Sequence, residues 1–157
     1  MKLILLIAAL PAALIFAGSG TAKAEQTIEE VGALVCVMDK WVEKELDKGH
    51  KVVDSSARCV DVPDDESDPK YTQVCPGQYE YMPDETWKAT GTCTDTYKSG
   101  DTKTEAWEEG SALKEYTYKI TGGTGKYQGA SGGGTYNYEN LTDTLSGGRY
   151  KGKIVLP

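Results

Sequence analysis

Histidine is almost absent from this sequence of 157 residues, in which His50 is the only one. Zinc sites usually draw on closely spaced cysteines and histidines, and no C-x-x-C pair is present. We therefore predict no metal site and expect no bound cofactor. A histidine-dependent hydrolase is also disfavoured, because His50 falls in a predicted turn.

Basic residues are fewer than acidic ones, with 17 Lys and Arg against 24 Asp and Glu and a formal net charge of -7. Proteins that bind nucleic acids need clustered lysine and arginine side chains to contact the phosphates. A nucleic-acid partner is therefore not expected.

Long apolar runs are missing after the first residues. The uncharged run from Leu3 to Ala17 has about 15 residues, fewer than the roughly 20 that a membrane-spanning helix needs. It follows Lys2 and leads to Ala22-Lys23-Ala24, an arrangement typical of an export signal with its cleavage site. We predict a signal peptide over residues 1–24, one domain over 25–157, export to the periplasm or the medium, and no stable membrane anchor.

Tyrosines spaced two residues apart indicate β-strands. They occur as Tyr79 and Tyr81, Tyr116 and Tyr118, and Tyr136 and Tyr138. This spacing places both rings on one face of a strand. Segments rich in Tyr, Thr, Val and Trp, separated by Gly, Asp and Pro, predict an antiparallel all-β domain.

The four cysteines of an exported chain are most simply two disulfides. A hairpin turn centred on Asp84 would place Tyr81 opposite Trp87 and Cys75 opposite Cys93, close enough to form a bridge. Cys36 and Cys59 would then form the second disulfide. A register shift of one residue would break this opposition, so the connectivity depends on the turn.

The segment from Thr27 to Leu46 has both helical and strand character. Thr27 and Glu30 fit a helix capping box, and an apolar stripe follows them at helical spacing. The same segment could instead fold back onto residues 51–62 through a turn at Asp47 to His50. We expect at most a short helix near Thr27, followed by strands.

Glycine is concentrated in the segment ITGGTGKYQGASGGGTY, residues 120–136. A phosphate-binding P-loop is excluded, because Gly125-Lys126 is followed by Tyr127 and preceded five residues earlier by Ile120. The dinucleotide pattern fails too, because its third glycine would fall at Gln128. We predict that these glycines shape a turn between two strands; they are Gly122, Gly123, Gly125 and Gly129.

Acidic residues gather near Asp61, in a segment that also holds Asp64, Asp65, Glu66 and Asp68. The segment lacks the alternating acids and central glycine of an EF-hand, so we expect a solvated loop. Paired glutamates, Glu43 with Glu45 and Glu108 with Glu109, could act as acid and base. We expect them instead to be solvated side chains of strands.

The glycine-rich segment resembles the strand, turn and returning strand of the allene oxide cyclase and dirigent proteins. It is also similar to exported bacterial proteins of unknown role that carry a strand like GTCTDT. The resemblance is specific over Lys119 to Tyr138 and loose over Trp87 to Tyr118. It implies one small antiparallel barrel of about eight strands. No position matches the catalytic residues of the cyclases or the acid and arginine residues of the dirigent pocket, so no activity is carried over.

Two functions fit such a barrel. The first, which we favour, is a non-enzymatic protein that binds a small, partly apolar or aromatic molecule in the barrel mouth or has a structural role. The second is an isomerase or cyclase that acts by shape on a lipid or phenolic substrate and needs a buried glutamate or tyrosine with a shifted pKa. Candidate lining residues are aromatic, namely Trp87, Trp107, Tyr116, Tyr118, Tyr136 and Tyr138. Nothing in the sequence defines the oligomeric state.

Overall fold

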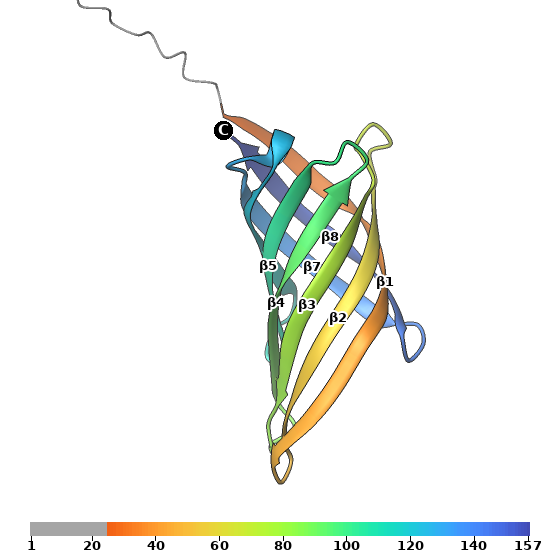
Figure 1. Cartoon of the computed structure of the whole chain (residues 1–157), viewed down its shortest axis with the longest axis vertical. Coiled ribbons are helices and arrows are strands. Elements are labelled where there is room, and N and C mark those ends of the chain that lie inside the picture. The colour runs from red at the N-terminus through yellow and green to blue at the C-terminus, as the bar shows by residue number, and fades with distance from the viewer. Residues whose placement is uncertain (1–24) are drawn as a thin grey trace, which may run out of the picture.

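The protein folds as a closed antiparallel barrel of eight β-strands, shown in Figure 1. The computed structural model describes residues 25–157. The strands are β1 (Gln26–Asp47), β2 (His50–Pro63), β3 (Tyr71–Tyr81), β4 (Trp87–Tyr97), β5 (Thr102–Gly110), β6 (Tyr116–Gly123), β7 (Ser131–Asn140) and β8 (Leu145–Leu156), with a 3-10 turn, η1 (Gly125–Tyr127), before β7. The predicted all-β barrel is confirmed. The predicted signal peptide, residues 1–24, lies outside the described residues.

Connections alternate between the two ends of the barrel, because every strand pair is antiparallel. The β1–β2 and β3–β4 turns lie at the bottom of Figure 1, and the β5–β6 and β7–β8 turns of the same end lie higher in this view. The other connections lie at the upper end. Across residues 25–157 there is no helix with the length and apolar character to cross a membrane.

The β3–β4 hairpin has the register that its turn predicted, with Tyr81 opposite Trp87. The Asp84 carboxylate accepts hydrogen bonds from the Thr86 backbone N–H at 3.1 Å and from the Thr86 hydroxyl at 2.6 Å. This local bonding is the reason that aspartate favours such turns.

The segment with mixed helical and strand character is a strand throughout. β1 pairs with β8 from Gln26 to Val37 and with β2 from Gly32 to Asp47. The expected short helix near Thr27 is therefore wrong. Pairing along both edges satisfies the backbone N–H and C=O groups of the segment and closes the barrel, whereas a helix would leave β2 and β8 with open edges.

Both disulfides join opposed residues of a hairpin. Cys36 is bonded to Cys59 between β1 and β2, and Cys75 to Cys93 between β3 and β4. The paired Cα atoms are only 4.0 and 4.1 Å apart, as expected of residues that lie opposite each other on neighbouring strands. The Cys75–Cys93 bridge predicted from the hairpin register is confirmed, as is the remaining pair, Cys36–Cys59. All four cysteines face the barrel interior.

The glycine-rich segment forms the β6–β7 connection at the upper end. Gly125 has a φ of +56°, and a side chain there would collide with the Asp101 carboxylate. Gly123 needs no unusual φ, but a Cβ would lie 2.2 Å from the Thr102 carbonyl oxygen. Gly122, near the end of β6, and Gly129, between η1 and β7, have φ of +146° and +76°.

Candidate functional site

A cavity of about 750 Å³ occupies the barrel interior. Its rim includes the exposed residues Lys40, Trp41 and Asp143, which places its opening at the lower end. A volume of several hundred Å³ is typical of sites for small molecules. All six aromatic residues named from the sequence line the cavity: Trp87, Trp107, Tyr116, Tyr118, Tyr136 and Tyr138.

Aromatic rings form one wall of the cavity. The ring centroid of Tyr116 lies 5.6 Å from that of Tyr136 and 5.5 Å from that of Tyr138, and Trp87 lies 6.1 Å from Tyr116. Such separations are those of favourable aromatic pairs. The wall therefore offers flat apolar surfaces to a guest.

Trp107 lies deeper in the cavity, with only 8% of its surface exposed. Its indole lies over two strand glycines, because a Cβ at Gly77 or Gly91 would come within 2.1 or 2.3 Å of the ring. The Nε1–H of Trp107 is buried and has no hydrogen-bond partner. A buried donor without a partner is costly, so this group is available to an acceptor on a bound molecule.

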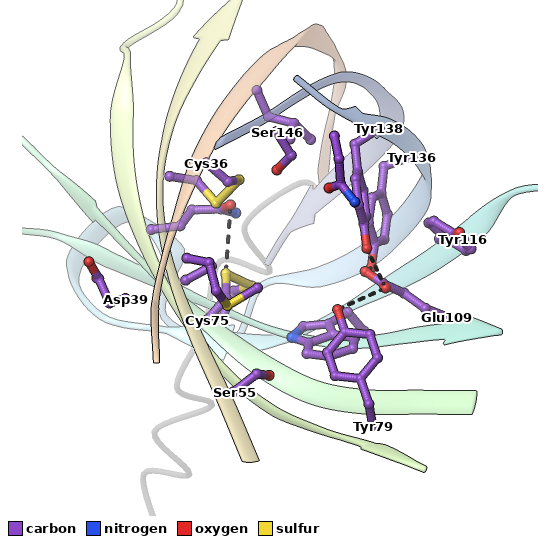
Figure 2. A pocket seen from close by; sticks show the side chains of 18 of the residues that line it. Cys36, Asp39, Ser55, Cys75, Tyr79, Glu109, Tyr116, Tyr136, Tyr138 and Ser146 are labelled. Carbon is purple, nitrogen blue, oxygen red and sulfur yellow. Dashed lines mark hydrogen bonds between the residues drawn. A yellow bond between two sulfur atoms is a disulfide. The ribbon is translucent and has the colours of Figure 1, made fainter. Parts of the chain in front are cut away.

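Glu109 is the centre of a hydrogen-bonded cluster in the aromatic wall (Figure 2). The hydroxyls of Tyr136 and Tyr138 each donate to its carboxylate at 2.8 Å, and the hydroxyl of Tyr79 donates at 3.1 Å. Burial raises the pKa of Glu109, and the three hydrogen bonds partly oppose that rise.

The expectation that Glu109 is a solvated strand residue is wrong, because only 5% of its surface is exposed. Glu109 lies two residues after Trp107 on β5 and therefore shares its inward face. This two-residue spacing from Trp107 was the sequence signal that could have placed Glu109 inside the barrel. Its neighbour Glu108 points outward and is exposed, as predicted.

The wall opposite Glu109 contains the two disulfides, as Figure 2 shows for Cys36 and Cys75. Ser55 and Ala57 of β2 also line this side. The Ser55 hydroxyl donates to the Gly77 carbonyl oxygen at 3.1 Å. The cavity thus has one aromatic, acidic wall and one wall of small side chains and sulfur.

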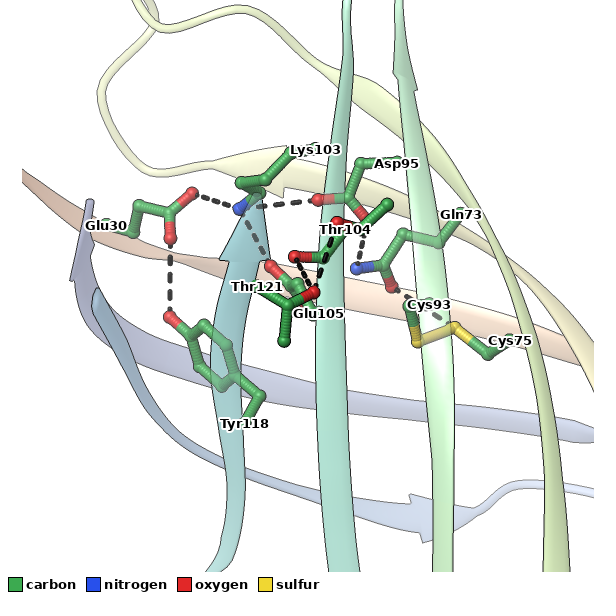
Figure 3. Close-up of polar contacts among 10 residues, drawn as sticks. All are labelled: Glu30, Gln73, Cys75, Cys93, Asp95, Lys103, Thr104, Glu105, Tyr118 and Thr121. Atoms are coloured by element: carbon green, nitrogen blue, oxygen red, sulfur yellow. Dashed lines mark hydrogen bonds and ion pairs between the residues drawn. A yellow bond between two sulfur atoms is a disulfide. The ribbon is translucent and has the colours of Figure 1, made fainter. Parts of the chain in front are cut away.

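Buried charges close the upper end of the barrel (Figure 3). The Lys103 Nζ lies 2.7 Å from Glu30, 2.8 Å from Glu105 and 3.3 Å from Asp95. Neither Lys103 nor Asp95 has any exposed side-chain surface. Burial lowers the pKa of Lys103, but the three carboxylates outweigh that effect and hold it well above its ordinary value. Lys103 therefore stays protonated.

Asp61 belongs to the same end of the cavity. It lies in β2 rather than in a loop, lines the cavity, and is only 2% exposed. Burial, with the charges of Asp95 and Glu105, raises the pKa of Asp61 to about 8. The expectation of a solvated Asp61 is wrong, because the strand continues to Pro63 and turns this side chain inward, whereas Asp64, Asp65 and Glu66 are exposed.

This cavity combines two chemically distinct regions. The Glu109 region near the opening can accept or give a proton and can bind hydroxyl groups. The region around Asp61 and Lys103, which we call the floor, is acidic and almost completely buried. Charged residues are rarely this buried unless they are paired, and the sequence analysis placed Tyr136 and Tyr138 in the cavity but not the carboxyls of either region.

No protein-family model matches this sequence, and no curated protein matches it. The chain is similar to solved structures of two pterocarpan synthase dirigent proteins. Similarity to GePTS1 has a TM-score of 0.59 at 15% identity and covers 92% of this chain and 99% of that one. Similarity to PsPTS1 has a TM-score of 0.55 at 12% identity and covers 83% of this chain and 96% of that one. These likenesses show a shared barrel fold.

Proposed function

We propose that this barrel binds a small, partly apolar aromatic molecule in its cavity. The observation that carries the proposal is a cavity of about 750 Å³ lined by tyrosine and tryptophan rings. Two groups there favour a guest with polar substituents. These are the unpartnered Nε1–H of Trp107 and the carboxyl of Glu109 with its three tyrosine hydroxyls.

We also propose that the protein works outside the cytoplasm. Two disulfides are typical of an oxidising compartment, and the N-terminal 24 residues have the pattern of a cleaved export signal. On this proposal cleavage after residue 24 would release the barrel, and its relatives include the allene oxide cyclases and exported bacterial barrels that the glycine-rich segment resembles.

Filling the cavity should abolish binding. Ala57 lines the cavity from β2, so the Ala57→Phe substitution would place a ring in the space that a ligand needs. In a thermal-shift screen of phenolics, oxylipins and fatty acids, we expect the wild type to show stabilisation that grows with ligand concentration. The Ala57→Phe variant should lose this response.

Val60→Phe is the matched control, because Val60 belongs to the same strand but faces outward with 49% of its surface exposed. It should keep the full response. A wild-type protein that no compound stabilises would contradict the binding proposal and favour a structural role. Equal responses in both phenylalanine variants would place the ligand outside the cavity.

A second candidate function is that of an isomerase or cyclase, and Glu109 is the observation that favours it. Its raised pKa and its place near the opening suit a general acid that protonates an epoxide or a similar reactive oxygen. The names of the two solved neighbours, pterocarpan synthase dirigent proteins, are consistent with this second candidate.

If the protein is an enzyme of this kind, Glu109→Gln should lower turnover by about 100-fold or more, since a general acid commonly contributes at least that factor. Turnover of lipid epoxides and phenolic substrates can be followed by chromatography. Glu108→Gln, one residue away on the exposed face of β5, should retain full activity. Activity that survives Glu109→Gln would remove this residue from the mechanism.

A further inference from the structure

We propose that the floor of the cavity binds a basic nitrogen, so that the ligand is an aryl-alkyl amine or a related organic cation. The inference rests on the proposed function and names the class of molecule. It concerns the end of the cavity opposite the opening, where Asp61 and Glu105 both line the wall.

Asp61 points to a missing partner. Its Oδ2 atom is buried and has no hydrogen-bond partner, although the side chain lines an open cavity. A buried carboxyl without a partner is costly. An N–H donor from a ligand is the group that would satisfy it.

The charges at the floor are unbalanced. Four carboxyl groups meet there, those of Glu30, Asp61, Asp95 and Glu105, and the cation with the largest effect on Asp61 is Lys103. The Lys103 Nζ lies 2.7 to 3.3 Å from carboxylate oxygens of Glu30, Glu105 and Asp95 and forms no ion pair with Asp61. A second positive charge would therefore be stabilised at this point.

An organic cation suits the floor better than a metal ion. In the described part of the chain, no three carboxylate, histidine or cysteine side chains are placed to hold a metal. The path to the floor is also aromatic. Glu105, Trp107 and Glu109 follow one another on the inner face of β5, spanning roughly 13 Å at the usual rise per strand residue. Because Glu105 is already paired with Lys103, a ligand would place its nitrogen at Asp61 and its ring against Trp107.

Three probes that differ only in their end group test the inference. Phenylbutylamine, phenylbutanol and phenylbutyrate share a ring and a chain and carry a positive, a neutral and a negative end. In calorimetric titrations at about pH 8.5, we expect the amine to bind about tenfold or more tightly than the alcohol, because only the amine gains a charge-assisted contact. The carboxylate should bind most weakly.

Substitution of Asp61 should remove this preference. Asp61→Asn keeps the size of the side chain but cannot carry a negative charge. In this variant we expect the amine and the alcohol to bind within about threefold of each other, because the charge-assisted contact is gone. Binding of the alcohol should change little.

The pH dependence of the wild type gives a second readout that needs no variant. Asp61 is largely protonated at about pH 6 and largely ionised at about pH 9, while an alkylammonium keeps its proton through this range. The preference for amine over alcohol should therefore rise about tenfold between these values. The ionisable groups that face Asp61 are Glu30 of β1, Tyr71 of β3, Asp95 of β4, Lys103 and Glu105 of β5, and Tyr150 of β8.

Equal binding of amine and alcohol at both pH values would overturn the amine assignment. It would leave the proposed function intact if Ala57→Phe still abolished that binding. An amine preference that persists in Asp61→Asn would overturn the role of Asp61. If none of the three probes and no member of the wider panel bound, the proposed function would fail together with this inference.

Discussion

Reduction of both disulfides is expected to lower the free energy of unfolding by about 6 kcal/mol, which would leave the barrel marginal or unfolded at room temperature. The bridges close loops with sequence separations of 23 and 18 residues. Loops of this size correspond to about 3 kcal/mol each, because the bridge restricts the unfolded chain. The two loops belong to different hairpins, so the effects should largely add.

Urea unfolding of oxidised and reduced protein measures this difference. Cys59 and Cys93 are almost completely buried, so reduction should be carried out in denaturant before refolding. The paired variants Cys36→Ala/Cys59→Ala and Cys75→Ala/Cys93→Ala each remove one bridge and should each show about half of the loss. Identical unfolding curves with and without dithiothreitol would contradict the prediction.

Replacement of Lys103 with methionine is expected to cost about 3 to 5 kcal/mol at neutral pH or above. The methionine side chain has a similar length but leaves Glu30, Asp95 and Glu105 buried without their cation. Removing one member of a buried ion pair is strongly destabilising, because the remaining charges keep their desolvation cost.

The effect of Lys103→Met should grow with pH. The pKa of Asp95 is raised to about 8, mainly by burial, and Lys103 opposes that rise. Because the unfolded carboxyl titrates near 3.8, the folded state holds an extra proton between these values, and stability falls as pH rises through the interval. Loss of Lys103 should raise the folded-state pKa of Asp95 further and so extend this interval to higher pH. The substitution should therefore lower the free energy of unfolding less at about pH 5 than at about pH 9.

Two controls separate this explanation from a general loss of folding. Lys119→Met changes an exposed lysine on β6 and should alter stability by less than about 0.5 kcal/mol. Asp95→Asn added to Lys103→Met removes one of the unpaired charges and should recover part of the loss. A double variant no more stable than Lys103→Met alone would contradict the account.

The alternation of tyrosines and the turn at Asp84 were enough to predict an all-β chain and the β3–β4 register. Register in turn placed Cys75 opposite Cys93. For β1 the sequence was ambiguous, because its apolar residues satisfy both a helical and a strand spacing. The strand conformation of β1 is decided by its pairing with β2 and β8. The partner of Gln26 on β8 is Leu156, 130 residues away, and such a distant pairing cannot be inferred from the spacing of apolar residues within β1.

The buried carboxyls were missed for a different physical reason. Because Asp61 and Glu109 are charged, they were expected to face water. On a strand, however, residues spaced two apart point to the same side, so a polar residue two positions from a buried aromatic residue also points into the barrel. Trp107 was expected to face inward, and Lys103, Glu105 and Glu109 share its phase on β5. The alternation of side chains along β5 therefore predicts which residues point inward better than their polarity does. It would have located both the floor and the Glu109 cluster.

The seam between β1 and β8 also constrains how the chain reaches its native state. It pairs Gln26 with Leu156, so the cylinder cannot close until the last strand has left the ribosome. Contacts this distant in sequence form slowly, and until they form β1 presents a long free edge that another chain could join. A nascent or C-terminally shortened chain should therefore depend on chaperones or rapid completion to avoid self-association.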